Sequence, residues 1–317
     1  MPSNKSSEDP VHFSFKRKKS WDENGVASTV GTILSIMVFM TFLGMFTNQY
    51  VPIWMKENET NHMNNVVGQL SNLKSGIDMQ VLNNNEQVAS APIFAPIQLH
   101  AEGVPVFASP TMGVLAFTSD GGVGGPSVQI NYTYKVSGTG PSYKLNSTNG
   151  GLTGGSLEFY GPNRYYIQQN VTMENGAIML KQVDGETILS GIAIRLVNNS
   201  GQLSVKITLT SLTGVSKTIG GFGTKSITST LEYTYYQKLA NPSGYYLNLT
   251  INTKYPRAWS QYFSDLLNKS GVSSNNVKIS GVIPYSGYRT VTVTIPGVDV
   301  LEYTKAVATI SIADIGV

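Results

Sequence analysis

A long stretch without charge near the start of the chain is the feature that most constrains what this protein can fold into. Residues 25–55 contain no charged side chain, and residues 26–46 (VASTVGTILSIMVFMTFLGMF) are apolar with small residues interspersed. An α-helix rises about 1.5 Å per residue, so about 20 such residues cross the hydrocarbon core of a bilayer. We therefore predict a transmembrane helix over residues 26–50.

Two other structures could contain an apolar stretch of this kind. A buried core helix rarely runs 31 residues without a charge, as residues 25–55 do. A secretory signal peptide has a shorter apolar region, which ends at a small-x-small cleavage site. We therefore favour the transmembrane helix over both alternatives.

The residues on either side of the apolar stretch predict its orientation. Residues 16–19 (KRKK) are all basic and precede the stretch, whereas only Lys56 follows it closely. Basic residues gather on the cytoplasmic side of membrane helices, and aromatic residues such as Tyr50 and Trp54 gather at the interfaces. We therefore predict a single-pass protein of the cell membrane, with a cytoplasmic N-terminus and everything after residue 50 outside the cell.

The N-terminal pattern resembles that of a known family. A basic stretch, a Gly25–Val26 junction and the sequence VASTVGTIL leading into an apolar helix are similar to the N-terminus of archaeal type IV pilin-like proteins, which carry a class III signal peptide. The resemblance implies that a prepilin peptidase cuts between Gly25 and Val26 and removes residues 1–25 as a cytoplasmic basic leader. It also implies that the helix anchors the protein and, in true pilins, packs with like subunits or other pilin-like proteins.

A second helical pattern follows the apolar stretch. Residues 51–85 predict an extracellular stalk helix that ends at three consecutive asparagines, and Val67 and Val81 broaden its apolar face. The centre of this face is a stripe with 3-4-3-4 spacing, made of Met63, Val66, Leu70, Leu73 and Ile77. The stripe could pack on the chain's own head or on the same helix of neighbouring subunits, and its short length favours the chain's own head.

Residues 86–317 read as a β-rich extracellular head. Residues 127–136, 202–210, 228–237, 245–254 and 290–295 are enriched in alternating, β-branched or aromatic residues and are separated by turn formers. The sequence VDGE at residues 183–186 predicts a hairpin turn. We predict an α+β protein in which the transmembrane and stalk helices precede a mainly antiparallel β-sandwich head, with one β subdomain or two that meet near residue 220.

One helix interrupts the strand series. Pro256 is suited to a helix start and Gly271 to a helix stop. Between them, an apolar stripe with helical spacing consists of Trp259, Tyr262, Phe263, Leu266 and Leu267. Trp259 could serve as a platform for a ligand, but its place inside the stripe favours packing against the sheet.

Catalytic and metal-binding patterns are absent from the sequence. The chain has no cysteine and only three histidines, His12, His62 and His100, which form no HExxH motif and no recognisable Ser-His-Asp set. The acidic residues of the head are scattered without a preferred pair: Glu158, Glu174, Asp184, Glu186, Glu232, Asp265, Asp299 and Glu302. We predict no catalytic, cofactor-binding or metal-binding residue and no enzymatic activity.

Three other features of the sequence carry little functional information. The glycine-rich residues 119–125 lack the Lys-Ser/Thr ending of a phosphate loop and predict a surface loop. The net charge of +3 reflects the basic cluster at residues 16–19, so it does not indicate nucleic-acid binding. Sequons for N-glycosylation start at Asn58, Asn131, Asn146, Asn170, Asn198, Asn248 and Asn268, and the abundance of asparagine, serine and threonine makes several of them expected by chance.

Three functions are compatible with this sequence. The first is a membrane-anchored, pilin-like structural or adhesive surface protein. The second is a membrane-tethered β-sandwich module that binds a carbohydrate or another surface protein. The third is an extracellular hydrolase that works through two carboxylates. We favour the first, and the sequence does not identify a ligand of the head.

Overall fold

The computed structural model describes residues 23–83, 90–121, 125–134, 142–146, 148, 150–199, 201–240, 245–272, 276–282 and 287–314. The basic cluster, His12 and the rest of the predicted leader up to residue 22 lie outside the described residues, as does part of the glycine-rich loop. The chain divides into two compact units, Met1–Tyr50 and Val51–Val317, and each is described by itself.

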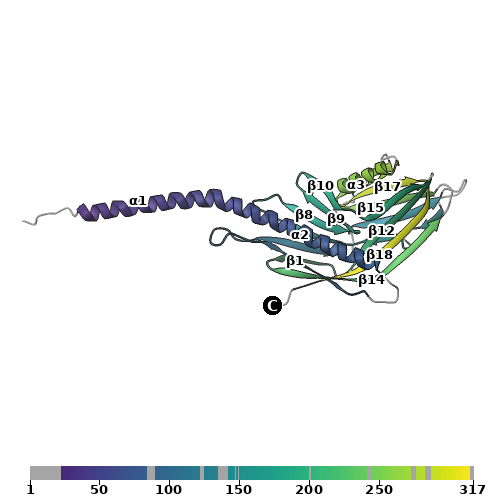
Figure 1. The fold of residues 1–317 in the computed structure, drawn as a ribbon, viewed down its shortest axis with the longest axis horizontal. Coiled ribbons are helices and arrows are strands. Elements are labelled where there is room, and N and C mark those ends of the chain that lie inside the picture. The colour runs from purple at the N-terminus through teal and green to yellow at the C-terminus, as the bar shows by residue number, and fades with distance from the viewer. Residues whose placement is uncertain are drawn as a thin grey trace, which may run out of the picture. The chain divides into compact units, whose positions relative to one another are not determined.

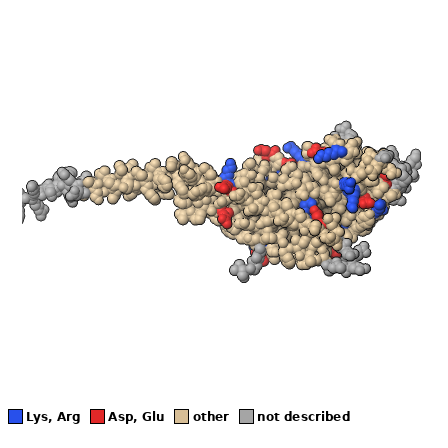
Figure 2. All heavy atoms as spheres, in the orientation of Figure 1, with Lys and Arg blue, Asp and Glu red and all other residues tan. Residues whose placement is uncertain are grey.

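The described part of the first unit is helical. It contains α1 (Glu23–Met45) and a π-helical turn, η1 (Phe46–Tyr50). Apolar side chains of α1 are exposed, with Ile33 at 59% and Met37 at 64%, and Figure 2 shows no charged atom on the described side chains of α1. Among the described residues, one helical run, Ala27–Leu82, contains a wholly exposed segment that is long and apolar enough to cross a membrane.

The threonines of the first unit satisfy their hydroxyl groups within their own helix. Thr41 donates to the carbonyl oxygen of Met37 over 2.8 Å, and Thr47 donates to that of Leu43 over 2.8 Å. A hydroxyl paired with the preceding turn needs no water. These polar residues are therefore compatible with a lipid environment.

The second unit begins with α2 (Val51–Leu82), where the sequence predicted a stalk helix over residues 51–85. All five residues of the predicted stripe are at most 1% exposed. They share one apolar cluster with Leu115 and Phe117 of one sheet and with Ile227 and Ile310 of another. In the structure, α2 therefore packs on the head of its own chain (Figure 1).

The strands described in the second unit form three sheets. The five-stranded sheet has the order β1 (Ile93–Gln98), β14 (Thr224–Ala240), β18 (Val298–Asp314), β12 (Gln202–Gly214) and β11 (Ala193–Asn199). The seven-stranded sheet has the order β10 (Gly185–Ser190), β9 (Ala177–Gln182), β8 (Gln169–Glu174), β7 (Ser156–Gly161), β3 (Thr111–Thr118) and β13 (Lys217–Gly221), and β2 (His100–Ala101) pairs with β3. The six-stranded sheet has the order β16 (Val277–Val282), β17 (Arg289–Pro296), β15 (Tyr245–Thr253), β4 (Ser127–Tyr134) and β5 (Ser142–Leu145), and β6 (Leu152–Gly154) pairs with β4.

The α+β class predicted from the sequence is confirmed, because an apolar N-terminal helix precedes a strand-rich unit in which antiparallel pairing dominates. The sandwich itself is not confirmed, since the strands form three curled sheets (Figure 1). Strand pairing runs across residue 220. Strand β12 precedes it and pairs in parallel with β18, which follows it, and β4 pairs antiparallel with β15 across that point.

The predicted head helix is α3 (Pro256–Lys269). Trp259, Phe263 and Leu267 are fully buried in the cluster formed by the six-stranded sheet and the long strands of the five-stranded sheet. Gly271 follows with φ +73°, a conformation that L side chains rarely adopt. Since Trp259 is 0% exposed, it is a core residue and not a platform for a ligand.

The buried side chain of Glu59 joins α2 to the start of β3 and to the β7–β8 connection of the seven-stranded sheet. Glu59 is 0% exposed and accepts a hydrogen bond from the Thr111 hydroxyl over 2.7 Å. It also accepts hydrogen bonds from the backbone N–H groups of Arg164, Tyr165 and Tyr166, over 3.0, 2.8 and 2.7 Å. Because three backbone N–H groups of the β7–β8 connection donate to this one side chain, Glu59 fixes the connection against α2.

The two histidines that the structure describes have structural contacts. His62 on α2 lies with its Nε2 2.8 Å from the carbonyl oxygen of Gln98, and burial lowers the pKa of this imidazole. The Nδ1 of His100 accepts the Gly223 backbone N–H over 3.1 Å, and its ring packs edge-on against Phe222. Each histidine therefore serves packing within the second unit.

Candidate binding groove

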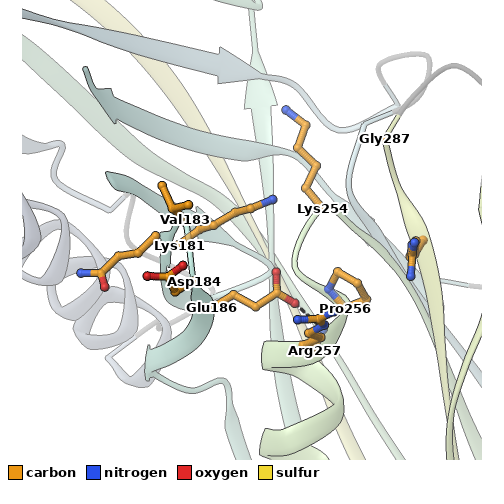
Figure 3. A pocket seen from close by; sticks show the side chains of 11 residues that line it. Lys181, Val183, Asp184, Glu186, Lys254, Pro256, Arg257 and Gly287 are labelled. Carbon is orange, nitrogen blue, oxygen red and sulfur yellow. Dashed lines mark hydrogen bonds between the residues drawn. The ribbon is translucent and has the colours of Figure 1, made fainter. Parts of the chain in front are cut away.

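A polar groove lies where the β9–β10 hairpin faces the end of β15 and the first turn of α3. Its cavity volume is about 310 Å³. The lining residues are Lys181, Gln182, Val183, Asp184, Gly185, Glu186, Lys254, Pro256, Arg257, Gly287 and Arg289 (Figure 3). A second hollow of about 290 Å³ shares four of them and adds Glu158, Tyr160, Gln168, Asn170 and Tyr255. Because the two hollows share these residues, we treat them together as the candidate groove.

The hairpin that forms one wall is the turn predicted from the VDGE sequence. Gln182 and Gly185 are register partners, so Val183 and Asp184 form the two-residue connection. Lys181 and Glu186 are the next pair of partners. The hairpin therefore brings side chains of both charges to the edge of the groove.

The opposite wall is the start of α3, and the chain already satisfies its free backbone donors. The Oε1 of Glu186 accepts hydrogen bonds from the backbone N–H groups of Arg257 and Ala258, the latter over 3.2 Å. Figure 3 shows Glu186 turned toward this helix start. The positive end of the helix dipole is occupied by a carboxylate of the chain itself, so a ligand has to be held by side chains.

Beneath the groove lies a fully buried carboxyl group. Glu174 is 1% exposed, and its Oε1 accepts the Thr253 hydroxyl over 2.6 Å and the Trp259 indole N–H over 2.7 Å. Burial raises the pKa of Glu174 to about 7, with a further contribution from the negative charge of Glu158. The two hydrogen bonds act in the opposite direction but do not compensate for the loss of water.

A hydrogen-bonded network connects this floor to the groove. Glu158 accepts from Lys254 over 3.2 Å and from the Tyr255 hydroxyl over 3.4 Å. The same Tyr255 hydroxyl lies 2.6 Å from the Thr172 hydroxyl, and burial raises the pKa of this phenol. The Lys181 amine lies 5.7 Å from the centre of the Tyr255 ring. The network holds both lysines beside the groove, where Figure 3 shows them reaching into the same space.

The groove has four basic side chains against three carboxylates. Of the carboxylates, Glu186 binds the start of α3, Glu158 pairs with Lys254, and Asp184 lies in the turn of the hairpin. Arg257 and Arg289 are exposed, and within the part of the chain that the structure describes no ion pair joins either of them to a carboxylate. Guanidinium groups, amines and side-chain amides in one polar groove can hold an anion and neighbouring hydroxyl groups.

The structure places the predicted glycosylation sequons in different environments. Asn198 and Asn268 are exposed, whereas Asn170 donates its amide to Glu158 inside the groove. The remaining four, which are only partly exposed, have hydrogen-bonded side chains: Asn58, Asn131, Asn146 and Asn248. Glycosylation stays a prediction at all seven positions.

The predicted peptidase junction lies in α1. Gly25 is exposed, and its carbonyl oxygen accepts the Thr29 hydroxyl over 3.1 Å. The side chain of Val26 lies outside the described residues. Cleavage at this junction stays a prediction.

Among the scattered acidic residues, the structure brings Glu158 close enough to Glu174 to help raise the pKa of Glu174. Asp184 and Glu186 lie on the groove, while Asp299 and Glu302 belong to the five-stranded sheet, where Glu302 pairs with Lys238. Glu174 is closed off from the groove and cannot exchange a proton with a bound molecule directly.

Sequence reasoning missed Glu59, Glu174 and the groove itself. The only signal was that Glu174 follows a strand-like run and precedes Asn175-Gly176, a turn, which is weak on its own.

Comparisons with protein-family profiles, with curated proteins and with solved structures each found no match to this chain.

Proposed function

We propose that this chain is a membrane-anchored, pilin-like extracellular protein with a structural or adhesive role, which displays its β-rich unit outside the cell. The observation that carries the proposal is the apolar part of α1. Its side chains are exposed, it carries no described charge, and it is joined to a large folded unit. An exposed apolar surface of this length is stable in lipid and not in water.

The orientation is tested by adding a protease to intact cells. We expect loss of the chain beyond residue 50, because the basic residues 16–19 favour the cytoplasmic side. A tag placed before residue 20 should stay protected, whether it remains attached or has been released with a leader, and should be digested once cells are lysed. A protected β-rich unit in intact cells would refute the proposed display. Mass spectrometry of the purified chain then shows whether the mature N-terminus is Val26, as pilin-like processing requires.

The groove favours a second function, capture of an anionic carbohydrate. Arg257, Arg289 and Lys181 can pair with carboxylate or sulfate groups, and Gln168 and Asn170 can bind sugar hydroxyls. A pilin-like protein with such a groove would serve as an adhesin. This function is compatible with the first and requires no additional domain.

The second function is tested with a defined polyanion. We expect the full chain to bind polygalacturonate and not neutral dextran. The double substitution Arg257→Glu and Arg289→Glu should weaken binding about tenfold or more, since each charged hydrogen bond contributes about 1.5 kcal/mol or more. Arg195→Glu together with Lys206→Glu is the matched control, because it changes the net charge by the same amount and both residues line a different hollow on the five-stranded sheet. Equal losses in the two variants would show that binding depends on overall charge and not on the groove.

A further inference from the structure

Six apolar or aromatic side chains are exposed around the first turns of α2. They come from α2, from the β2–β3 connection and from the β7–β8 connection. We call this set the apolar rim, and its exposed fractions are Ile53 61%, Trp54 43%, Val106 100%, Phe107 39%, Tyr165 41% and Ile167 48%. Single exposed apolar residues are ordinary, but a set gathered at one place indicates an interaction surface.

Two adjacent residues of α2, Asn58 and Glu59, hold the two connections next to this helix through hydrogen bonds. The Asn58 amide donates to the carbonyl oxygen of Glu102 over 3.1 Å, which holds the β2–β3 connection. Glu59 accepts the backbone N–H groups of Tyr165 and Tyr166, which holds the β7–β8 connection. Both connections are therefore fixed next to the turn of α2 that follows Ile53 and Trp54.

The tip of the β2–β3 connection is a tight turn with an unusual residue. The backbone N–H groups of Phe107 and Ala108 both donate to the carbonyl oxygen of Val104, over 3.0 and 2.9 Å. Pro105 and Val106 are the central residues, and Val106 has φ +71°. A turn with proline first and positive φ second normally has glycine or asparagine at the second place. A β-branched valine there is strained, and strained residues are retained where they serve a function.

Each of the two connections carries one charged residue, Glu102 and Arg164, and both are exposed. The stretches that follow them, residues 103–110 (GVPVFASP) and 165–170 (YYIQQN), contain no acidic or basic side chain. Aromatic and aliphatic side chains among uncharged polar groups are typical of proteins that contact the interface of a bilayer.

We propose that the apolar rim rests in the headgroup region of the outer leaflet of the membrane that this chain crosses. The inference rests on the proposed membrane anchoring. Val51, the first residue of α2, follows directly on Tyr50, the last residue of the apolar unit, so the covalent chain keeps Ile53 and Trp54 within a helical turn of it. Contact between the apolar rim and the bilayer then limits the motion of the β-rich unit about the membrane helix.

The test uses the full chain in liposomes and exploits its lack of cysteine. Val106→Cys takes an environment-sensitive fluorophore, and lipids with a nitroxide at the headgroup or the upper acyl chain serve as quenchers. We expect loss of emission at residue 106. Val183→Cys and Val215→Cys are matched controls, because these valines are 80% and 85% exposed in other connections and should keep their emission. None of the three substitutions disturbs a buried contact.

A fourth label separates failure of the rim from failure of the anchor. Met37→Cys reports on α1, and it should be quenched by lipids that carry the nitroxide deep in the acyl chain. If residue 37 is quenched and residue 106 behaves like residue 183, the rim does not touch the bilayer and the inference is wrong while the anchoring stands. If residue 37 is not quenched, the anchoring itself is wrong. If residue 106 is shielded from aqueous iodide but not quenched by lipid, a second copy of the chain covers the rim, which also overturns the inference.

Discussion

Leu70→Asp is expected to lower the free energy of unfolding of the second unit by about 5 kcal/mol or more, which leaves it largely unfolded. Leu70 is 0% exposed at the centre of the cluster that joins α2 to the sheets. Deleting a buried leucine side chain costs about 2–5 kcal/mol, and an unpaired charge in the same place adds several more. Urea titration of the detergent-solubilised chain, followed by the tertiary signal of its tryptophans, measures the loss.

The matched control for this substitution lies on the same helix. Met79 is 59% exposed, so Met79→Asp introduces the same charge on α2 without entering the core. Its effect on unfolding should be within about 0.5 kcal/mol, as for most surface changes. If Leu70→Asp unfolds like Met79→Asp, α2 does not pack on its own head, and the same helix in neighbouring subunits becomes the partner of the stripe.

The stability of the second unit is expected to fall as the pH rises from about 4.5 to about 7. Glu174 has its pKa raised to about 7 in the folded protein by burial, against 4.5 for the exposed group. Below both values the carboxyl group is protonated in both states, and its contribution to stability is fully present. As the pH rises, the unfolded state ionises first. Because each pKa unit between the two states corresponds to about 1.4 kcal/mol, the loss is about 3 kcal/mol and is complete above about pH 7.

Glu174→Gln isolates this contribution from those of other groups. Glutamine cannot ionise, and its side-chain oxygen can still accept the Thr253 hydroxyl and the Trp259 indole N–H. The variant should therefore be more stable than the unchanged protein at pH 8, and the difference should shrink toward pH 4.5. Glu232→Gln, at an exposed position of β14, is the control and should leave the pH profile unchanged. A Glu174→Gln profile that runs parallel to that of the unchanged protein would mean that Glu174 is charged when folded.

The features that could be predicted from the sequence all depend on local periodicity. The stripe from Met63 to Ile77 shows the 3-4 spacing of a helix face, and α3 shows the same pattern with proline at its start. The hairpin at Val183 needs only two turn residues between two apolar runs. Neighbours along the chain determine these structures, so the chain alone indicates them.

The predictions that failed or were not made depend on contacts between distant segments. The sequence left open whether the head has one β subdomain or two, and it did not reveal that β12 pairs with β18, about a hundred residues further along the chain. Glu174 and Trp259 meet across 85 positions, and Glu59 and Tyr166 meet across 107. No local sequence pattern predicts that Glu59 or Glu174 is buried, because the residues around each carboxylate come from distant segments of the chain.

The sequence by itself determined the apolar helix without charges, the amphipathic helix after it, the α+β class and the location of α3. A hydrophobic pattern specifies which face of an element is buried, since removing apolar surface from water favours any partner of matching character. Only the tertiary structure decided which partner each face received. It shows that α2 lies on its own head and that the described strands form three sheets. It also shows that one groove is lined by Lys181, Lys254, Arg257 and Arg289. The physical reason is that the hydrophobic effect is non-directional. The order and register of the strands therefore depend on the packing of the whole unit.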